Sequence, residues 1–259
     1  MHESFLARAD SASALPRLGG MARPDGVVVV SERFWAHARM DGSVREGSMP
    51  AVATAFRRVP LVRGLARIVA SVSPLFRRTG VARRPERALL AAALVAPCAF
   101  FFLPGAASLV AGLVLTVALV AWLLRGRTLF LHGAEHRAIA AAEERRLADT
   151  WTGRALPTRF SLRCGTNFAM LVLPVAVFAD LLWPLPTTLF TPVVVAVLAL
   201  ALTMELWVVV QASQRPLARA FLLPGLGLQR LTTREPTLGE TRVALAAVAS
   251  VLRRELDAP

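Results

Sequence analysis

The chain has 259 residues and a formal net charge of +13, with 55% of its residues hydrophobic and only 18% charged. Soluble domains carry about 25% charged residues, so this composition argues against an ordinary soluble enzyme and against a disordered basic tail. A strongly positive chain can bind nucleic acid or an anionic membrane surface. The apolar residues lie in long uncharged stretches, which favours the membrane.

Residues 1–17 contain charged side chains but no continuous apolar core, so we expect a disordered segment there and no secretory signal. Residues 18–50 contain two apolar runs, Val27–Ser31 and Phe34–Arg39, each next to a turn signal that includes glycine. Runs of β-branched and aromatic residues beside such turns are typical of strands. The region is therefore predicted to form a β-hairpin or a small sheet.

A basic amphipathic helix is predicted within residues 55–80. Apolar residues recur there at helical spacing, and residues 57–87 contain nine arginines but only one acidic residue, Glu86. Such a helix favours the anionic inner leaflet of a membrane. Its apolar face could equally pack on the rest of the protein. The apolar positions are Leu61, Leu65, Ile68, Val72 and Leu75.

Two long uncharged stretches are predicted to form hydrophobic helical hairpins. Residues 86–124 include an apolar run that is too long for one span of about 20 residues, and Pro104 with Gly105 divides it. Residues 167–214 are divided in the same way near Pro184. The pattern predicts four membrane helices, although the shorter ones also fit a V-shaped hairpin that does not fully cross the bilayer.

The arginines set the expected orientation. They flank the open ends of both hairpins, whereas neither hairpin tip carries one. By the positive-inside rule, both termini and the central residues 128–166 face the cytoplasm. We therefore expect a mainly α-helical, multi-pass protein of the bacterial cytoplasmic membrane, with a small N-terminal β element and cytoplasmic amphipathic helices. Anionic inner-leaflet lipids are the expected partners, and nucleic acid is not, because the membrane accounts for the arginines.

The sharpest chemical signal lies in the central segment, in the run His132-Gly-Ala-Glu135-His136. It has the order His-x-x-Glu-His of the inverzincin metallopeptidases. Residues four apart lie on one face of a helix, so both imidazoles could reach one divalent ion, for which zinc is the first candidate. Glu135, on the same side of the helix, could act as the general base that activates water.

A third ligand would have to come from elsewhere in the chain. Cys164 begins the second hairpin, and a thiolate suits zinc, although a small buried apolar residue is an equally good interpretation. Glu205 is the one acidic residue inside the last apolar helix, and it could be a ligand, a proton carrier or the partner of an arginine. Glu143 lies about 10 Å along the helix axis from His136, which favours an outer or packing position.

Residues 221–256 are expected to form a cytoplasmic loop and a helix that ends near Leu256. Thr237 and Glu240 have the spacing of a capping box, which predicts the start of that helix. Four polar residues before it could line a pocket near the metal motif, or could simply form turns and caps. They are Gln229, Thr232, Thr233 and Glu235.

The motifs Leu131–Arg137 and Arg163–Phe168 resemble the YqhQ-like bacterial family, a domain of unknown function labelled a predicted metal-dependent enzyme. The resemblance implies a metal site, with Arg163 and Thr166 beside its ligands. The chain departs from the family at Ser161 and Leu162, where the family has His-Pro. Other similar segments follow in the same order over about residues 18–252. They are Gly19–Val27, Pro60–Gly64, Met204–Glu205, Pro224–Gln229 and Leu231–Pro236.

Two hypotheses about function follow. The first is a metal-dependent membrane enzyme, a hydrolase at the cytoplasmic face, with Glu135 as its base and Glu205 among the residues that complete the metal site. The second is a non-catalytic scaffold, adaptor or lipid-binding protein with a diverged metal site. A transporter is less favoured, because four spans with few embedded acids offer little pathway. The sequence leaves open whether the chain forms a homo-oligomer or binds another protein.

Overall fold

The computed structural model describes residues 2–51, 56, 58–77, 80–100, 103, 105–188, 190–213 and 215–257. The chain divides into two compact units, and each is built from segments that are remote in the sequence. We call them the sheet unit (Met1–Ala51, Leu123–Cys164 and Leu226–Pro259) and the helical unit (Val52–Trp122 and Gly165–Gly225).

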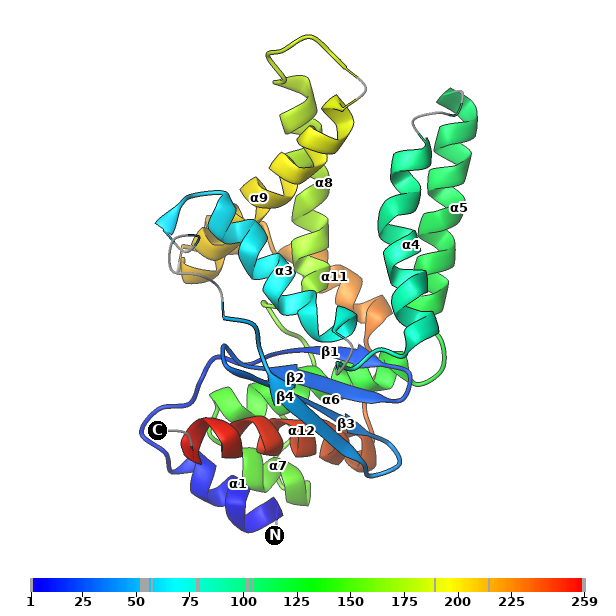
Figure 1. The fold of residues 1–259 in the computed structure, drawn as a ribbon. Coiled ribbons are helices and arrows are strands. Elements are labelled where there is room, and N and C mark those ends of the chain that lie inside the picture. Colours follow the sequence, from blue (N-terminus) through cyan, green and yellow to red (C-terminus); the bar gives the residue numbers. More distant parts are fainter. Residues whose placement is uncertain are drawn as a thin grey trace. The chain divides into compact units, whose positions relative to one another are not determined.

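The sheet unit contains a four-stranded antiparallel sheet in which strands that follow one another in the sequence are neighbours, in the order β1-β2-β3-β4 (Figure 1). In its register, Val29 of β2 pairs with Gly20 of β1 and with Ala36 of β3. The small sheet predicted for residues 18–50 is thereby confirmed. Its strands are β1 (Gly19–Arg23), β2 (Gly26–Val30), β3 (Phe34–Arg39) and β4 (Val44–Ser48).

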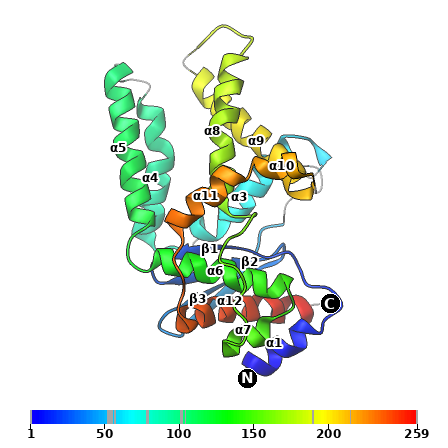
Figure 2. The same ribbon diagram turned by 180° about the vertical axis from the view of Figure 1, so that it is seen from behind.

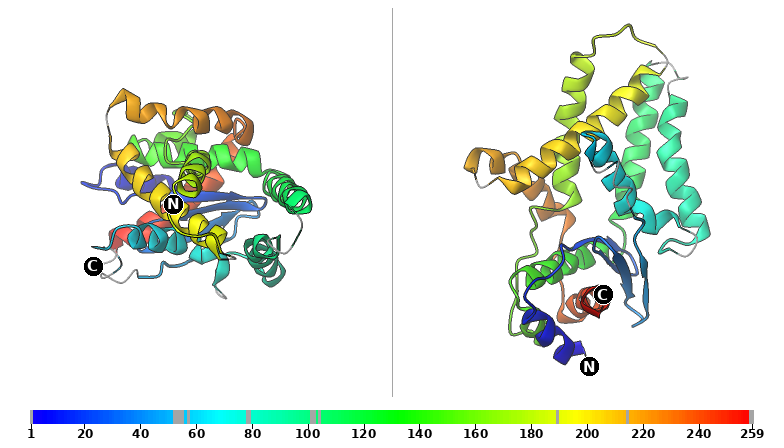
Figure 3. Two further views of the ribbon diagram at one scale, coloured as in Figure 1. Left: turned by 90° about the horizontal axis from the view of Figure 1, so that it is seen from above. Right: turned by 60° about the vertical axis from the view of Figure 1, so that its left-hand side comes forward.

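Two helices cover one face of this sheet and two more lie beyond them (Figure 3). The helix α6 contacts β1 and β2, whereas α12 contacts β2, β3 and β4 as well as α6. The core between them is built from Val27, Val29 and Ala36 of the strands together with Leu131 and Leu245 of the helices. The helices are α1 (His2–Asp10), α6 (Thr128–Glu143), α7 (Leu147–Thr152) and α12 (Leu238–Asp257).

The expectation of a disordered segment over residues 1–17 is wrong, because His2–Asp10 forms α1. Phe5 and Leu6 of this helix are buried in the core of the sheet unit. The Asp10 carboxylate accepts hydrogen bonds from the backbone N–H groups of Leu147 and Ala148, each at 3.0 Å, and so caps the start of α7. The apolar positions are too few for a periodic signal in the sequence, but tertiary packing makes the helix stable.

The capping box predicted before the last helix is confirmed. Thr237 Oγ1 accepts a hydrogen bond from the Glu240 N–H at 3.3 Å, and the Glu240 carboxylate accepts one from the Thr237 N–H at 2.9 Å. The reciprocal pair satisfies two backbone donors that the first turn of a helix leaves open.

Asp25, in the turn between β1 and β2, is surrounded by cationic or ionisable side chains. Its carboxylate lies 3.6 Å from His37 Nε2, 3.4 Å from Arg23 Nε and 3.1 Å from Arg39 Nε. The His37 imidazole foremost, and then the two guanidinium groups, hold the pKa of Asp25 well below its usual range.

We expect Asp25→Asn to lower the stability of the chain at neutral pH and to flatten its dependence on acid. A carboxylate whose pKa falls on folding stabilises the fold above its ordinary pKa, and this contribution is lost as the pH falls toward the folded-state pKa. Because solvent screens the partly exposed side chain, the loss should be about 1 kcal/mol. The measurement is the free energy of unfolding at neutral pH and at about pH 3. An equal loss of stability in acid by variant and parent would contradict the prediction.

The helical unit consists of helices only, within the part of the chain that the structure describes. The helices α8 and α9 pack on each other through Leu171, Trp207 and Val210, and the rings of Phe168 and Trp207 meet edge to face. The helices α4 and α5 lie side by side as a hairpin (Figures 1 and 2). The helices are α3 (Val62–Phe76), α4 (Arg84–Phe100), α5 (Gly105–Leu123), α8 (Gly165–Leu181), α9 (Thr191–Ala212), α10 (Pro216–Ala220) and α11 (Leu223–Thr232), the last of which continues into the sheet unit.

The amphipathic helix expected within residues 55–80 is present as α3, which ends at Phe76. Residues 55, 57, 78 and 79 of the predicted segment, Arg57 among them, lie outside the described residues.

Of the described helices, α9 alone is long and apolar enough to cross a membrane, with 22 residues and a mean hydropathy of 2.6. Shorter apolar helices are formed by Ala106–Trp122 within α5 and by α8. The prediction of four membrane helices is therefore wrong by length and composition, because only α9 among the described helices is both long enough and apolar enough to cross a membrane. Charged residues occupy the first turn of α4, and α8 ends at Leu181, shortly before the prolines of the loop.

Candidate metal centre

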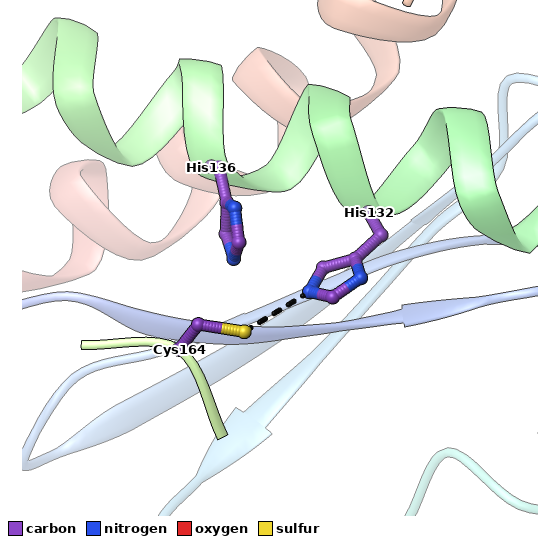
Figure 4. A group of neighbouring side chains, drawn as sticks. All are labelled: His132, His136 and Cys164. Carbon is purple, nitrogen blue, oxygen red and sulfur yellow. Dashed lines mark hydrogen bonds between the residues drawn. The ribbon is translucent and has the colours of Figure 1, made fainter. Parts of the chain in front are cut away.

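Three potential metal ligands converge in the sheet unit. His132 and His136 lie one turn apart on α6, and Cys164 is the last residue of the loop that precedes α8. One donor atom of each side chain lies within 4.8 Å of the donors of the other two. Figure 4 shows both imidazoles directed from α6 toward the Cys164 thiol. A metal ion could thus be held by residues that the sequence analysis had selected from two separate motifs.

The backbone fixes the orientation of both imidazoles. His132 Nδ1 lies 2.8 Å from the Thr232 carbonyl oxygen, and His136 Nδ1 lies 2.7 Å from the Arg159 carbonyl oxygen. A carbonyl only accepts hydrogen bonds, so Nδ1 must carry the proton and Nε2 keeps its lone pair in each neutral ring. His132 Nε2 is 3.3 Å from Cys164 Sγ. This arrangement matches the tautomer and the outer hydrogen bonds that metal-binding histidines use.

Burial favours the neutral form of these histidines. Desolvation lowers the pKa of His132 and of His136 below the ordinary value for histidine. Burial thus favours the unprotonated ring, the state in which an imidazole can bind a metal.

Glu135 is the acidic group beside this cluster. Its Oε2 lies 3.7 Å from His136 Nε2, and burial raises the pKa of its carboxyl to about 7. The strand β1 makes room for it, because a Cβ at Gly20 would lie 2.8 Å from Glu135 Cγ and Oε1. A carboxyl with this pKa can both accept and return a proton near neutral pH.

Gln229 holds the loop that carries Cys164. Its side chain is fully buried and spans the backbone of Ser161, donating to the carbonyl oxygen at 2.7 Å and accepting from the N–H at 2.9 Å. The Cys164 N–H in turn donates to the Ser161 carbonyl at 3.5 Å. The amide thus positions the thiol without touching it.

We expect Gln229→Leu to weaken metal binding about tenfold to a hundredfold, as the loss of outer-shell contacts does elsewhere. The reason is that the Ser161 backbone loses the two hydrogen bonds that Gln229 makes with it, so the Cys164 loop is held less firmly. Competition with a chromogenic chelator measures the affinity. Gln211→Leu is the matched control, because the Gln211 Nε2 has no hydrogen-bond partner among the described residues. Equal affinities of the two variants would refute a positioning role for Gln229.

The remaining polar residues predicted near the site form a network around the same loop. Arg159 Nη1 donates to Thr233 Oγ1 at 2.9 Å, and its Nε lies 3.2 Å from the Glu235 carboxylate. Glu235 also pairs with Arg137, a buried residue of α6 whose Nε donates to the Pro157 carbonyl at 3.0 Å. These contacts tie residues 157–164 and 229–235 to α6.

Other predicted residues have different surroundings. Glu143 forms an ion pair with Arg163, and Thr166 is the second residue of α8, in the helical unit. Glu205 belongs to α9 of the helical unit, where it pairs with Arg63 and accepts a hydrogen bond from the Leu61 N–H at 3.0 Å. Of the three roles that the sequence allowed for Glu205, the structure shows that of an arginine partner.

Gly133, inside the histidine motif, lies where another segment of the chain approaches α6 closely. A Cβ at this position would lie 2.2 Å from the Arg234 carbonyl oxygen, so only glycine lets residues 232–236 approach α6 this closely. That approach brings the Thr232 carbonyl to His132.

The structure adds residues that sequence reasoning missed as parts of the site. Arg137 and Gly20 were read as parts of motifs but not as contacts of the site. Arg159 acts through its backbone carbonyl, which every residue type has, so no sequence signal could have found this contact. Thr232 was expected near the motif as a polar residue, and it is its backbone carbonyl that contacts His132. A signal for Arg137 did exist, namely an arginine directly after the histidine motif and before the apolar run Ala138–Ala142.

The donor set fits a transition metal ion. Two nitrogen donors and one thiol suit zinc or a similar soft divalent ion better than magnesium or calcium. Zinc lies about 2.0–2.3 Å from such ligands, so donors at this spacing reach one ion with small movements.

Comparisons with curated proteins and with solved structures found no match. The sequence pattern of one family matches residues 87–254, a stretch that includes the whole candidate metal centre. The chain therefore belongs to the family described as protein of unknown function (DUF1385).

Proposed function

We propose that the chain is a zinc-dependent hydrolase of the YqhQ-like type, placed in the bacterial cytoplasmic membrane with several helices and with both termini in the cytoplasm. One observation carries the proposal. Backbone carbonyls hold His132 and His136 in the tautomer that leaves the Nε2 lone pair free, and both rings lie beside the Cys164 thiol. The buried Glu135 carboxyl lies 3.7 Å from His136 Nε2.

The number of ligands supports a catalytic rather than a structural site. Structural zinc sites use four protein ligands, whereas catalytic ones use three and keep one position open for a reactant. The described residues supply three, His132, His136 and Cys164. When bound, the ion supplies Lewis-acid chemistry, which polarises a carbonyl or phosphoryl oxygen and lowers the pKa of water.

Glu135 supplies the proton transfer in this proposal. Its Oε2, beside His136 Nε2, is placed to accept a proton from an attacking water and to return it to the leaving group. Its raised pKa, about 7, suits both directions at neutral pH. Gly20 and the apolar core around α6 exclude bulk water from this carboxyl.

Exposed apolar side chains support the membrane location. Large apolar side chains of the helical unit, such as Val117, Phe178 and Val209, are more than half exposed. Extensive exposed apolar surface on several helices is typical of contact with lipid or another apolar partner. At about 1.5 Å per residue, the 22 residues of α9 span the bilayer core, and the 17 of α8 fall only a few ångströms short, which local thinning can accommodate.

The test is hydrolysis by the full chain in detergent, loaded with zinc or stripped by a chelator, on chromogenic carboxylic esters, amides and phosphodiesters. We expect one zinc ion per chain and hydrolysis of one of these classes that is lost on stripping and restored by zinc. A chain that binds no transition metal, or that hydrolyses no class when loaded, overturns the proposal.

A further inference from the structure

One face of α3 is used to pack on the helix α9. A Cβ at Gly64 would lie 3.0 Å from Met204 Cβ, so the two backbones approach closely at this point. Glu205, the next residue of α9, pairs with Arg63 and accepts the hydrogen bond of the Leu61 N–H. These contacts attach the start of α3 to the one described helix that is long and apolar enough to cross a membrane.

The opposite face of α3 is apolar and uncovered. Val62, Val69 and Phe76 are 38%, 66% and 41% exposed. Residues seven apart lie within about 20° of each other on a helix, so the three form one stripe. Gly64 follows Val62 by two residues, which is roughly 200° around the helix, so the stripe faces away from α9.

The segment that contains this stripe is rich in arginine. Residues 47–85 contain no Asp or Glu. Among the described residues of this stretch, the exposed arginines are Arg58, Arg67, Arg77, Arg83 and Arg84. Arg77 directly follows Phe76 of the stripe, whereas Arg67 lies about 140° around the helix from Val62, on the side that carries Gly64. An apolar helix face within an arginine-rich segment that has no acid is complementary to a layer of acyl chains below anionic headgroups.

We propose that α3 lies in the headgroup region of an anionic phospholipid leaflet, with Val62, Val69 and Phe76 turned toward the acyl chains. The attachment to α9 holds α3 beside a membrane helix, and the arginines select anionic lipid. This inference rests on the membrane placement of α9 proposed above, but not on the metal chemistry.

The test places a photoreactive benzoylphenylalanine at position 69 of the full chain, reconstituted in nanodiscs of mixed phosphatidylcholine and phosphatidylglycerol. Mass spectrometry identifies what is crosslinked. We expect lipid adducts enriched in phosphatidylglycerol over its share of the mixture. Arg58→Gln with Arg77→Gln, two exposed arginines before and after α3, should lower the enrichment, by up to about fivefold for each arginine. Arg45→Gln with Arg146→Gln, two exposed arginines of the sheet unit, is the matched control and should leave it unchanged.

The same photoreactive group at position 197, on exposed Val197 of α9, reports the membrane placement separately. Lipid adducts at position 197 but none at 69, or peptide adducts at 69, overturn the assignment of α3 alone. Lipid adducts at 69 without enrichment in phosphatidylglycerol overturn the role of the arginines. No lipid adducts at either position would overturn the membrane placement together with this inference.

Discussion

Replacement of Cys164 by alanine should cost the chain its metal ion, whereas the same replacement at the other cysteine, Cys98, should not. Structural zinc sites contribute roughly 10–16 kcal/mol over four ligands, so the loss of one ligand should weaken binding about a hundredfold to a thousandfold. His136→Ala should have a similar effect, because its Nε2 faces the same point. Metal analysis after gel filtration gives the stoichiometry, and chelator competition gives the affinity.

The pair of cysteine variants separates metal binding from folding. Both remove one thiol from a chain that has two. Circular dichroism of each variant shows whether the helices persist. If the Cys164→Ala chain keeps both its helices and the parental metal content, then the candidate metal centre is wrong.

Glu135→Gln should leave the metal in place and remove the hydrolysis that we propose. The amide has the size of the carboxyl but cannot accept a proton at neutral pH, and general acid–base catalysis contributes typically about 10²–10⁴-fold in rate. We therefore expect a fall of that size in kcat, with metal content unchanged. The assay is hydrolysis of the substrate class identified with the zinc-loaded parent.

Glu144→Gln is the control for this variant. Glu144 is the exposed residue that follows α6, and its replacement makes the same change of a carboxyl into an amide as Glu135→Gln. It should keep parental activity. Parental activity in the Glu135→Gln chain would show that another group moves the proton, even if the metal centre is present.

Local patterns predicted much of the fold and part of the site. The spacing of His132 and His136 already placed both rings on one helix face, because helical periodicity is a property of the local sequence. The turn signals around the strands and the Thr237–Glu240 capping box were informative for the same reason. Alternating apolar residues and capping side chains act over a few neighbouring positions, so strands and helix starts can be predicted from the local sequence.

The long-range parts could not be read in this way. Cys164 was one of two candidates for a third ligand, and only the folded loop places it at the histidines while Glu205 meets Arg63 in the helical unit. The helix α1 was missed because its stability comes from partners far along the chain, such as α7. Apolar composition suggested four membrane helices, but where α4 and α8 begin and end depends on flanking charges and prolines that composition does not weigh.

Because backbone carbonyls orient His132 and His136, side-chain substitutions cannot reveal which residues hold these two imidazoles. The Thr232 side chain can be exchanged without removing the carbonyl that orients His132, so an alanine scan would score this position as silent. Changes that redirect the chain itself, such as an insertion between Thr232 and Arg234 or a side chain at Gly133, would rotate the imidazole instead. The course of the backbone thus orients these ligands. An insertion or deletion in the segments that carry the Arg159 and Thr232 carbonyls should therefore weaken metal binding more than a side-chain substitution there.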